Sequence, residues 1–191
     1  MDLNSDNVKE LLESVSEKIR CNVAACVEAF SKIKWKKVSF IIPTVPKPSQ
    51  RPRLSGYRVY VPGAAKNATF FNNNVLPKLK GLFITTPCKI KSDIYIETPS
   101  SFTKTQKCLA EMKILRPWAH SGDIDNFLKS TMDSMLPNEK RGHIGIMYDD
   151  CLVIDASTKK YYSKTPRTEV TIYFMENVPE TLKKILRIDE S

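Results

Sequence analysis

The chain is organised around two acidic clusters, Asp123-Ile-Asp125-Asn126-Phe-Leu-Lys129 and, further along, Asp149-Asp150. Carboxylates repel one another, so such a concentration is unfavourable unless positive charge lies among them. Lys129 supplies one positive charge. A divalent cation is the obvious further candidate, because hard cations prefer carboxylate oxygen ligands. The two clusters therefore predict a site where carboxylates and a metal ion meet.

The first cluster lies on a predicted helix from Ile124 to Met135. Apolar or small residues recur there at helical spacing and define a face that we expect to be buried, namely Ile124, Phe127, Leu128, Thr131 and Met135. The other side carries Asp125, Lys129 and Asp133 at four-residue steps. The Lys129 ammonium can therefore neutralise either neighbour or act on a bound substrate. Asp123 falls at the helix start, where a carboxylate can cap free amides.

The second cluster separates two apolar runs, Ile144–Tyr148 and Cys151–Ile154. This pattern predicts a strand, a sharp break and a second strand. Carboxylates at the end of a strand and at the start of a helix can converge on one point.

At these positions the chain resembles the RusA-type Holliday-junction resolvases. Their motif is Asp-x-Asp-Asn, a lysine four residues after the second aspartate, then Asp-Asp and a short hydrophobic strand. The matching residues are Asp123, Asp125, Asn126, Lys129, Asp149, Asp150 and Leu152–Ile154. The family's amino-terminal signature resembles Ser39–Pro43, Pro46–Arg53 and Tyr57–Pro62, and the likeness covers roughly Val38 to Phe174. Many relatives place Lys-Pro before the first aspartate, where this chain has Ser121-Gly122, so we expect a more flexible approach loop.

The resemblance implies a Mg²⁺-dependent endodeoxyribonuclease that resolves Holliday junctions by paired nicks during DNA recombination and repair. The family's acidic triad corresponds to Asp123, Asp125 and Asp150, which we expect to be catalytic and to bind metal. Asp149 is a further candidate that binds metal directly, bridges through water or caps the strand turn. Lys129 would stabilise the scissile phosphate or orient the water, and Asp133 would tune Lys129. By family analogy, the DNA backbone would be gripped by Arg51, Arg53, Arg58 and Lys66.

Phosphodiester cleavage at neutral pH sets chemical demands that this site would meet. It requires an activated water, neutralised charge on phosphorus and a stabilised leaving oxygen. One or two Mg²⁺ ions supply all three, paired ions lying about 3.5 to 4 Å apart, and Mn²⁺ can substitute. The resemblance also implies a homodimer, since a two-fold dimer presents two identical sites to a four-way junction of matching symmetry.

Positive charge is concentrated in one segment of the chain. Thirteen of the 30 basic residues, and none of the 21 acidic ones, lie between Lys32 and Ser92. Trp35, Tyr57 and Tyr60 are among the aromatic residues interleaved with them. Lysine and arginine displace condensed counterions while aromatic rings stack on bases, so this composition favours a nucleic-acid surface over an ordinary solvated one. No strongly amphipathic basic helix is visible there to favour a membrane surface.

Composition agrees with an ordinary protein of the cytoplasm, bacterial or phage-encoded. No stretch approaches the eighteen or so apolar residues that span a bilayer, and residues 1–6 lack a basic region followed by an apolar core. The five cysteines form no Cys-x-x-Cys pair, so we expect reduced, mostly buried thiols and no structural zinc.

The remaining patterns predict an α+β fold, a single RusA-like domain with a mixed β-sheet packed by helices. We assign residues 37–175 to this domain, 1–36 to an amino-terminal amphipathic helical extension and 176–191 to a carboxy-terminal helix. The expected strands are Val38–Ile42, Tyr57–Val61, Lys89–Glu97 and a hairpin of Leu152–Tyr162 with Glu169–Phe174. The expected helices are Val8–Phe30, Ala64–Lys80 disturbed by Pro77, Lys104–Lys113 and Pro179–Leu186.

Two other functions fit the same residues. The chain can be a nuclease for flaps, forks or other branched DNA, which only cleavage of defined substrates would separate from junction resolution. It can also be a non-catalytic DNA-binding protein whose acidic cluster holds a structural cation. Lys129 argues against the second alternative, because a purely structural Mg²⁺ or Ca²⁺ site does not need a lysine among its ligands.

Overall fold

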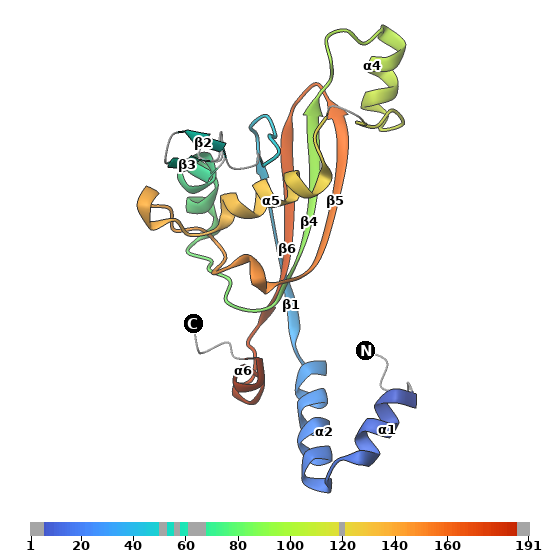
Figure 1. Cartoon of the computed structure of the whole chain (residues 1–191), viewed down its shortest axis with the longest axis vertical. Helices are drawn as coiled ribbons and strands as arrows, with labels where there is room; N and C mark the ends of the chain where they lie inside the picture. Colours follow the sequence, from blue (N-terminus) through green and yellow to red (C-terminus); the bar gives the residue numbers. More distant parts are fainter. Residues whose placement is uncertain (1–5, 50–52, 56–57, 61–67, 119–120, 187–191) are drawn as a thin grey trace. The chain divides into compact units, whose positions relative to one another are not determined.

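The computed structural model describes residues 6–49, 53–55, 58–60, 68–118 and 121–186 (Figure 1). The chain divides into two compact units. One spans Lys36–Phe174, and the other joins the terminal segments Met1–Trp35 and Met175–Ser191. Within the described ranges, no helix combines the length and the apolar character needed to cross a membrane.

A four-stranded mixed sheet forms the larger unit. Its strands are β1 (Lys34–Ile42), β6 (Arg167–Glu176), β4 (Cys88–Glu97) and β5 (Val153–Ser163), in that spatial order. β4 pairs parallel with β5 and antiparallel with β6. This mixed sheet, together with the helices, confirms the α+β class.

The expected hairpin of the last two strands is wrong, because β4 lies between β5 and β6. The intervening residues Lys164–Pro166 pass over the end of β4. Neighbouring strands are only about 4.8 Å apart, so three residues suffice to cross one strand. The short connection between the antiparallel strands β5 and β6 is therefore compatible with a third strand between them.

One face of this sheet forms the core. Side chains alternate along β4, and Ile90, Ser92 and Ile94 are buried while Lys91 is exposed. Ile90 pairs with Ile172 of β6 in the ladder, and both belong to the main hydrophobic cluster. The predicted strand Lys89–Glu97 is thus confirmed, and the alternation of its side chains determines which face a helix must cover.

Helix α5 (Ile124–Met135) covers this face with the predicted bounds. It buries Phe127, Thr131 and Met135, while Ile124, expected on the same face, is 44% exposed in the first turn. Burial of a side chain such as Phe127 contributes about 1.5 to 3 kcal/mol. This packing fixes which side of α5 remains open to solvent, and that side carries the acidic cluster.

Other segments depart from the expected pattern. The described part of the expected helix Ala64–Lys80 is helical over 68–70, then forms a π-helix, η1 (Phe71–Val75), and a 3-10 helix, η2 (Leu76–Leu79), that contains Pro77. A proline cannot donate the next helical hydrogen bond, which accounts for the tightened end. The expected strand at 57–61 is seen as β3 (Arg58–Tyr60). It pairs with β2 (Arg53–Ser55) in a separate two-stranded sheet rather than with the main one.

Helix α4 (Lys104–Glu111) begins at a capping box. Thr103 accepts from the backbone N–H of Gln106, and the Gln106 side chain accepts from the backbone N–H of Thr103. This reciprocal pair explains why the predicted helix begins at Lys104.

The terminal unit contains α1 (Asp6–Ser14), α2 (Glu17–Ser31) and α6 (Glu180–Leu186). The expected single helix Val8–Phe30 is wrong. Ser16 adopts an extended backbone at the N-cap of α2 (φ −63°, ψ 155°), so the chain breaks after α1 and starts a new helix. Ser16 suits such a break because serine favours helix starts over helix interiors. Met175, Val178 and Leu182 form this unit's core with Phe30 and Ile33 beside them.

Candidate active site

The first two aspartates lie at the start of α5. Asp123 is the N-cap residue, with an extended backbone, and its side chain makes no capping hydrogen bond. The expectation that it caps the helix amides is therefore wrong. Both Asp123 and Asp125 are exposed. Their carboxylates accordingly remain accessible to a ligand at the positive end of the helix dipole.

Lys129 lies one turn beyond Asp125 on the same side of α5. Its Nζ is 3.8 Å from Oδ1 of Asp133, and these side chains are 58% and 39% exposed. Of the two neighbours that the spacing offered, this ion pair selects Asp133. An exposed pair of this kind contributes only about 0.3 to 0.5 kcal/mol, so the ammonium exchanges readily to another anion.

Asp150 brings the second acidic cluster to this side of α5. The pKa of Asp133 is raised, first by burial and also by the charge of Asp150, while Lys129 acts in the opposite direction. The charge of Asp150 can act on Asp133 in this way only if the two side chains lie within the range of electrostatic interaction. The second acidic cluster therefore interacts electrostatically with the part of α5 that carries Lys129 and Asp133.

Backbone hydrogen bonds explain how Asp150 reaches α5. The N–H groups of Ile146 and Met147 both donate to the carbonyl of Met135, the last residue of the helix, at 2.8 and 3.4 Å. Ile84 N–H donates to Ile146, and Tyr148 N–H donates back to the carbonyl of Ile84. The expected strand Ile144–Tyr148 is therefore wrong: it is reduced to an isolated bridge between Ile84 and Met147. Its residues pair with a helix end instead of a sheet.

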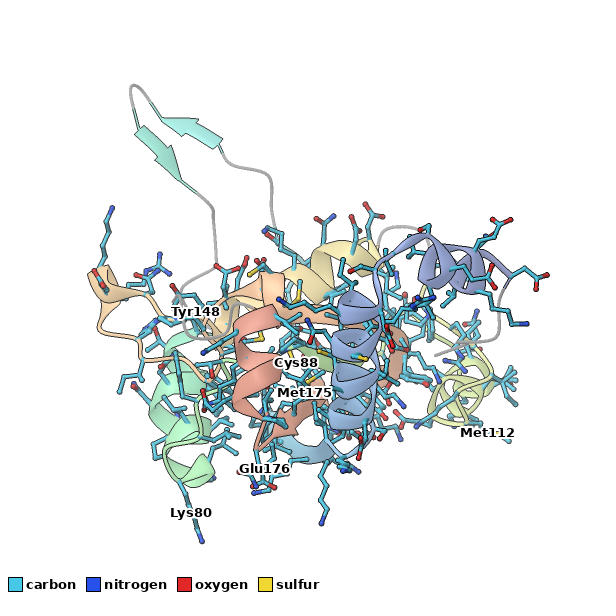
Figure 2. All side chains as sticks on the ribbon, turned by 90° about the horizontal axis from the view of Figure 1, so that it is seen from below. Lys80, Cys88, Met112, Tyr148, Met175 and Glu176 are labelled. Carbon is cyan, nitrogen blue, oxygen red and sulfur yellow. The ribbon has the colours of Figure 1, made fainter. Side chains whose placement is uncertain are left out.

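Asn72 of η1 fastens the same loop from the other side. Its Oδ1 accepts from the backbone N–H groups of Ile144 and Gly145 at 3.0 and 3.1 Å. The loop leaves this anchor and passes through Tyr148, labelled in Figure 2, directly into Asp149. The site therefore depends on contacts that the motif itself does not contain.

Asp149 caps the turn that follows. Its Oδ1 accepts from the backbone N–H of Cys151 at 2.8 Å, at the start of the short helix η4 (Asp150–Leu152). Hydrogen bonds from Cys151 lower the pKa of Asp149. Of the three roles considered for Asp149, these contacts support capping of the turn. Metal binding through its second carboxylate oxygen stays a prediction.

The proline-rich basic loop packs against the start of α5. Ser49 N–H donates to the carbonyl of Asn126 at 2.9 Å. Gly122 has φ +85°, and a Cβ added there would lie 2.9 Å from Cγ of Pro48. A glycine is therefore needed for close approach as well as for its backbone conformation. This contact brings the proline-rich loop of the basic segment to the acidic cluster.

Lys160 of β5 is a residue that the sequence reasoning missed. Its Nζ donates to the carbonyl of Gly122 at 2.6 Å and to Oγ of Ser121 at 3.2 Å. A positive charge from the sheet thus occupies the stretch where the chain lacks the Lys-Pro of many relatives. Nothing in the local sequence signals this, since Lys160 lies beyond the motif in a strand that carries several other polar residues.

The predicted DNA contacts are only partly described. Arg53 and Arg58 lie in β2 and β3, of which the backbone is described, whereas Arg51 and Lys66 lie outside the described residues. These four residues stay predictions as DNA ligands.

The donor set suits a hard divalent cation. Its candidate ligands are carboxylates, which supply the oxygen donors that such cations prefer. Among the described residues, however, no three histidine, cysteine, aspartate or glutamate side chains are grouped so as to hold a metal ion. Metal binding by Asp123, Asp125, Asp149 and Asp150 therefore stays a prediction, in which the ion itself would draw the carboxylates together.

The cysteines are all free thiols. Burial raises the pKa of Cys88 to about 11, and its Sγ lies 3.6 Å from Sδ of Met147 in the interior (Figure 2). Cys21, Cys108 and Cys151 are exposed, so the expectation of mostly buried thiols is wrong. A solvent-exposed free cysteine is compatible with a reducing compartment.

Comparisons with known proteins show which family the chain resembles. The family model described as "Endodeoxyribonuclease RusA" matches residues 43–173, which include both acidic clusters and Lys129. An uncharacterized protein of Bacillus subtilis (strain 168), YqaN, is 35% identical over 91 residues, which are 47% of this chain and 58% of that relative. The chain thus matches less than two thirds of the relative's length. Since the family model covers well over half of the sequence, the chain belongs to the RusA endodeoxyribonuclease family.

Proposed function

We propose that this chain is a Mg²⁺-dependent endodeoxyribonuclease that cuts branched DNA and resolves four-way junctions by paired nicks. The single observation that carries the proposal is the arrangement on the open side of α5. Two exposed carboxylates at its start, Asp123 and Asp125, are followed by Lys129 and then by Asp133, whose pKa is raised by burial and also by the charge of Asp150. Such a mixture of acids around one mobile ammonium suits a site that binds both cations and phosphate.

Asp123, Asp125 and Asp150 would hold the ion, with Asp149 as a further candidate through its second oxygen. When bound, Mg²⁺ would supply a Lewis acid for the phosphoryl oxygens and an acidified water. Mn²⁺, which shares this preference for oxygen ligands, would substitute.

Lys129 would act directly on the substrate. Its weak pairing with Asp133 leaves the ammonium able to move to a non-bridging phosphate oxygen, where charge accumulates in the transition state. Asp133 would hold the lysine near the site between turnovers. Lys160 would keep the Ser121–Gly122 turn in place, so that Asp123 enters the helix in an exposed position.

Substrate binding would use the basic segment that the proline-rich loop brings to α5. Its contact between Ser49 and Asn126 places this loop beside the acidic cluster. We further propose that two copies act together as a homodimer, because paired nicks in strands of like polarity require two sites related by two-fold symmetry.

The decisive experiment compares labelled DNA substrates with the purified full chain. A four-way junction, a flap, a fork and a plain duplex are incubated with Mg²⁺, with Mn²⁺ and with chelator. We expect symmetric nicks in the junction with either metal and none with chelator. We also expect Asp125→Asn to lower the cleavage rate at least about 100-fold while junction binding persists. If the enzyme cuts flaps or forks in preference to the junction, the proposed substrate is wrong. Full activity of the Asp125→Asn variant would refute the catalytic assignment.

A further inference from the structure

The sheet face opposite α5 carries a group of aromatic and basic side chains where β4 and β5 end. Tyr95 pairs with Tyr161 across the parallel ladder and with Arg167 across the antiparallel one, so all three project from the same face. The two tyrosine rings stack, with centroids 5.3 Å apart and planes at 23°. This face is the one that the main core does not use.

Three cations lie against these rings. Cζ of Arg167 is 3.8 Å from the centroid of Tyr95, and Cζ of Arg116 is 4.3 Å from that of Tyr161. Nζ of Lys113 lies 5.2 and 4.7 Å from the two centroids and donates to the Tyr95 hydroxyl at 3.2 Å. We call Tyr95, Tyr161, Lys113, Arg116 and Arg167 the cation–tyrosine cluster. Cations held over aromatic faces are stabilised there in a defined orientation.

The cluster presents positive charge outward. Arg167 is paired with Glu169 at 2.7 Å, whereas Lys113 and Arg116 are exposed and lie over the rings. The hydrogen bond to Tyr95, with a smaller effect of Asp93 among others, raises the pKa of Lys113, so its ammonium stays charged at neutral pH. Two cations are therefore available to an anion from solvent.

Backbone strain places one of these cations. Lys113 has φ +61°, in the left-handed region that glycine or asparagine adopts more easily. The strained turn is secured by N–H donation from Lys113 to Ala110, and from Ile114 and Leu115 to Leu109. A lysine kept in a strained conformation at the end of a helix suggests a functional use of its side chain.

The cluster is linked to the acidic site by one short segment. The chain runs from Lys113 through the 66% exposed Trp118 to Asp123. In β5, Lys160 bonds to Gly122 on the α5 side, and its neighbour Tyr161 projects to the opposite face. β5 is an edge strand, so the cluster and the acidic site flank the same edge of the sheet.

We propose that the cation–tyrosine cluster binds the sugar–phosphate backbone of a DNA arm that leads away from the cleavage site. The proposal rests on the proposed function and adds a second substrate contact to the basic segment of residues 32–92. Charge complementarity indicates the ligand, because two exposed cations near the same sheet edge as the proposed nuclease site match successive phosphates. Guanidinium groups bind phosphate oxygens in pairs. The exposed Trp118 offers a face on which an unpaired base at the branch can stack.

The test is the salt dependence of binding in chelator, where no cutting occurs. Fluorescence anisotropy measures the affinity of the full chain for a labelled four-way junction at a series of salt concentrations. We expect Lys113→Gln with Arg116→Gln to reduce the slope of log K against log salt by about 1.8, since each lost phosphate contact removes about 0.9. Arg116→Gln alone should remove about half of that. Circular dichroism verifies that the variants fold.

A matched control removes two exposed lysines elsewhere, with Lys104→Gln and Lys184→Gln, and should leave the slope unchanged. The inference is overturned if the Lys113 and Arg116 variants keep the wild-type slope, or if the control loses as much. Cleavage with Mg²⁺ is measured separately, so a wild type that binds but does not cut refutes the nuclease alone. A wild type that does not bind the junction refutes both proposals.

Discussion

Lys129 combines two properties that a catalytic lysine needs. It is anchored on a helix whose other side is buried through Phe127 and Thr131, so its Cα is fixed. Its side chain is nevertheless 58% exposed, and its ammonium is only weakly paired with Asp133. Because the Cα of Lys129 is fixed and its ammonium can move, the ammonium can reach a phosphate without a change of fold.

Replacement of Lys129 by alanine should remove activity and spare the fold. We expect the cleavage rate to fall at least about 100-fold, because the variant lacks the charge that we propose to stabilise the phosphate. The free energy of unfolding should change by less than about 0.5 kcal/mol, because the ion pair is exposed. Single-turnover cleavage and urea unfolding measure the two effects, with Lys129→Arg as the charge-retaining control. Full activity of the alanine variant would assign the lysine a structural role.

Asp133 should make stability depend on pH in a defined direction. Burial and the charge of Asp150 raise its pKa in the folded state, so the folded protein holds this proton more tightly than the unfolded chain. The ionised carboxyl therefore lowers stability above its folded pKa, and the loss disappears as the pH falls through that pKa. In chelating buffer, Asp133→Asn should raise Tm slightly at pH 7, and the gain should vanish below about pH 3.9. A lower Tm at pH 7 would show that the pair with Lys129 dominates, and Glu139→Gln serves as the exposed control.

At the scale of elements, the loop between α5 and β5 has the most demanding geometry. Gly145 adopts φ +73°, and an added Cβ would lie 2.6 Å from backbone atoms of Met135, Leu136 and Pro137. This close approach lets Ile146 and Met147 bond to the end of α5. The position of Asp150 thus depends on a glycine that carries no chemistry itself.

Gly145→Ala should therefore destabilise the protein by about 2 kcal/mol or more, because backbone atoms cannot move aside as side chains do. Gly142→Ala is the matched control. It has φ +64° in the same loop, but nothing lies within 4 Å of the added Cβ, so only the conformational cost of about 1 kcal/mol applies. Urea unfolding of both variants gives the comparison. Equal losses would show that the steric contact is relieved by a shift of the loop.

In the molecule as a whole, the family match covers part of the larger unit and none of the terminal unit. The family model ends within Lys36–Phe174 on both sides, whereas α1, α2 and α6 belong to the other unit. The terminal helices therefore lie outside the part of the chain that the family shares. The predicted metal ligands Asp123, Asp125, Asp149 and Asp150 all belong to the larger unit.

A metal ion that binds only the folded chain should raise its stability as a whole. We expect Mg²⁺ to increase Tm in a concentration-dependent manner, by about 2.7 kcal/mol of unfolding free energy at 100 times the dissociation constant. Chelator should reverse the rise, and sodium chloride of equal ionic strength should not reproduce it. Thermal melts of the Asp123→Asn, Asp125→Asn double variant should show no such increase. An equal rise in that variant would place the ion elsewhere.

The amino-acid sequence alone predicted the helix Ile124–Met135 and the strand Lys89–Glu97 correctly. These features rest on spacing between near neighbours, which the chain displays directly. The same spacing also identified Lys129 with its two acidic partners. Local patterns failed at Ser16, where one apolar stripe continues through a break in the helix.

The strand order, the contacts of Lys160, the hydrogen bonds that place the loop before Asp150 and the cation–tyrosine cluster became visible only in the folded structure. The hairpin of β5 and β6 was wrong because β4, distant in sequence, inserts between them. Lys160 contacts Gly122 because the edge strand β5 lies next to the start of α5. Tyr95 of β4 likewise contacts Lys113, which lies 18 residues further along the chain. Each of these contacts joins residues that are far apart along the chain, and the packing that brings them together depends on the whole core rather than on any local spacing.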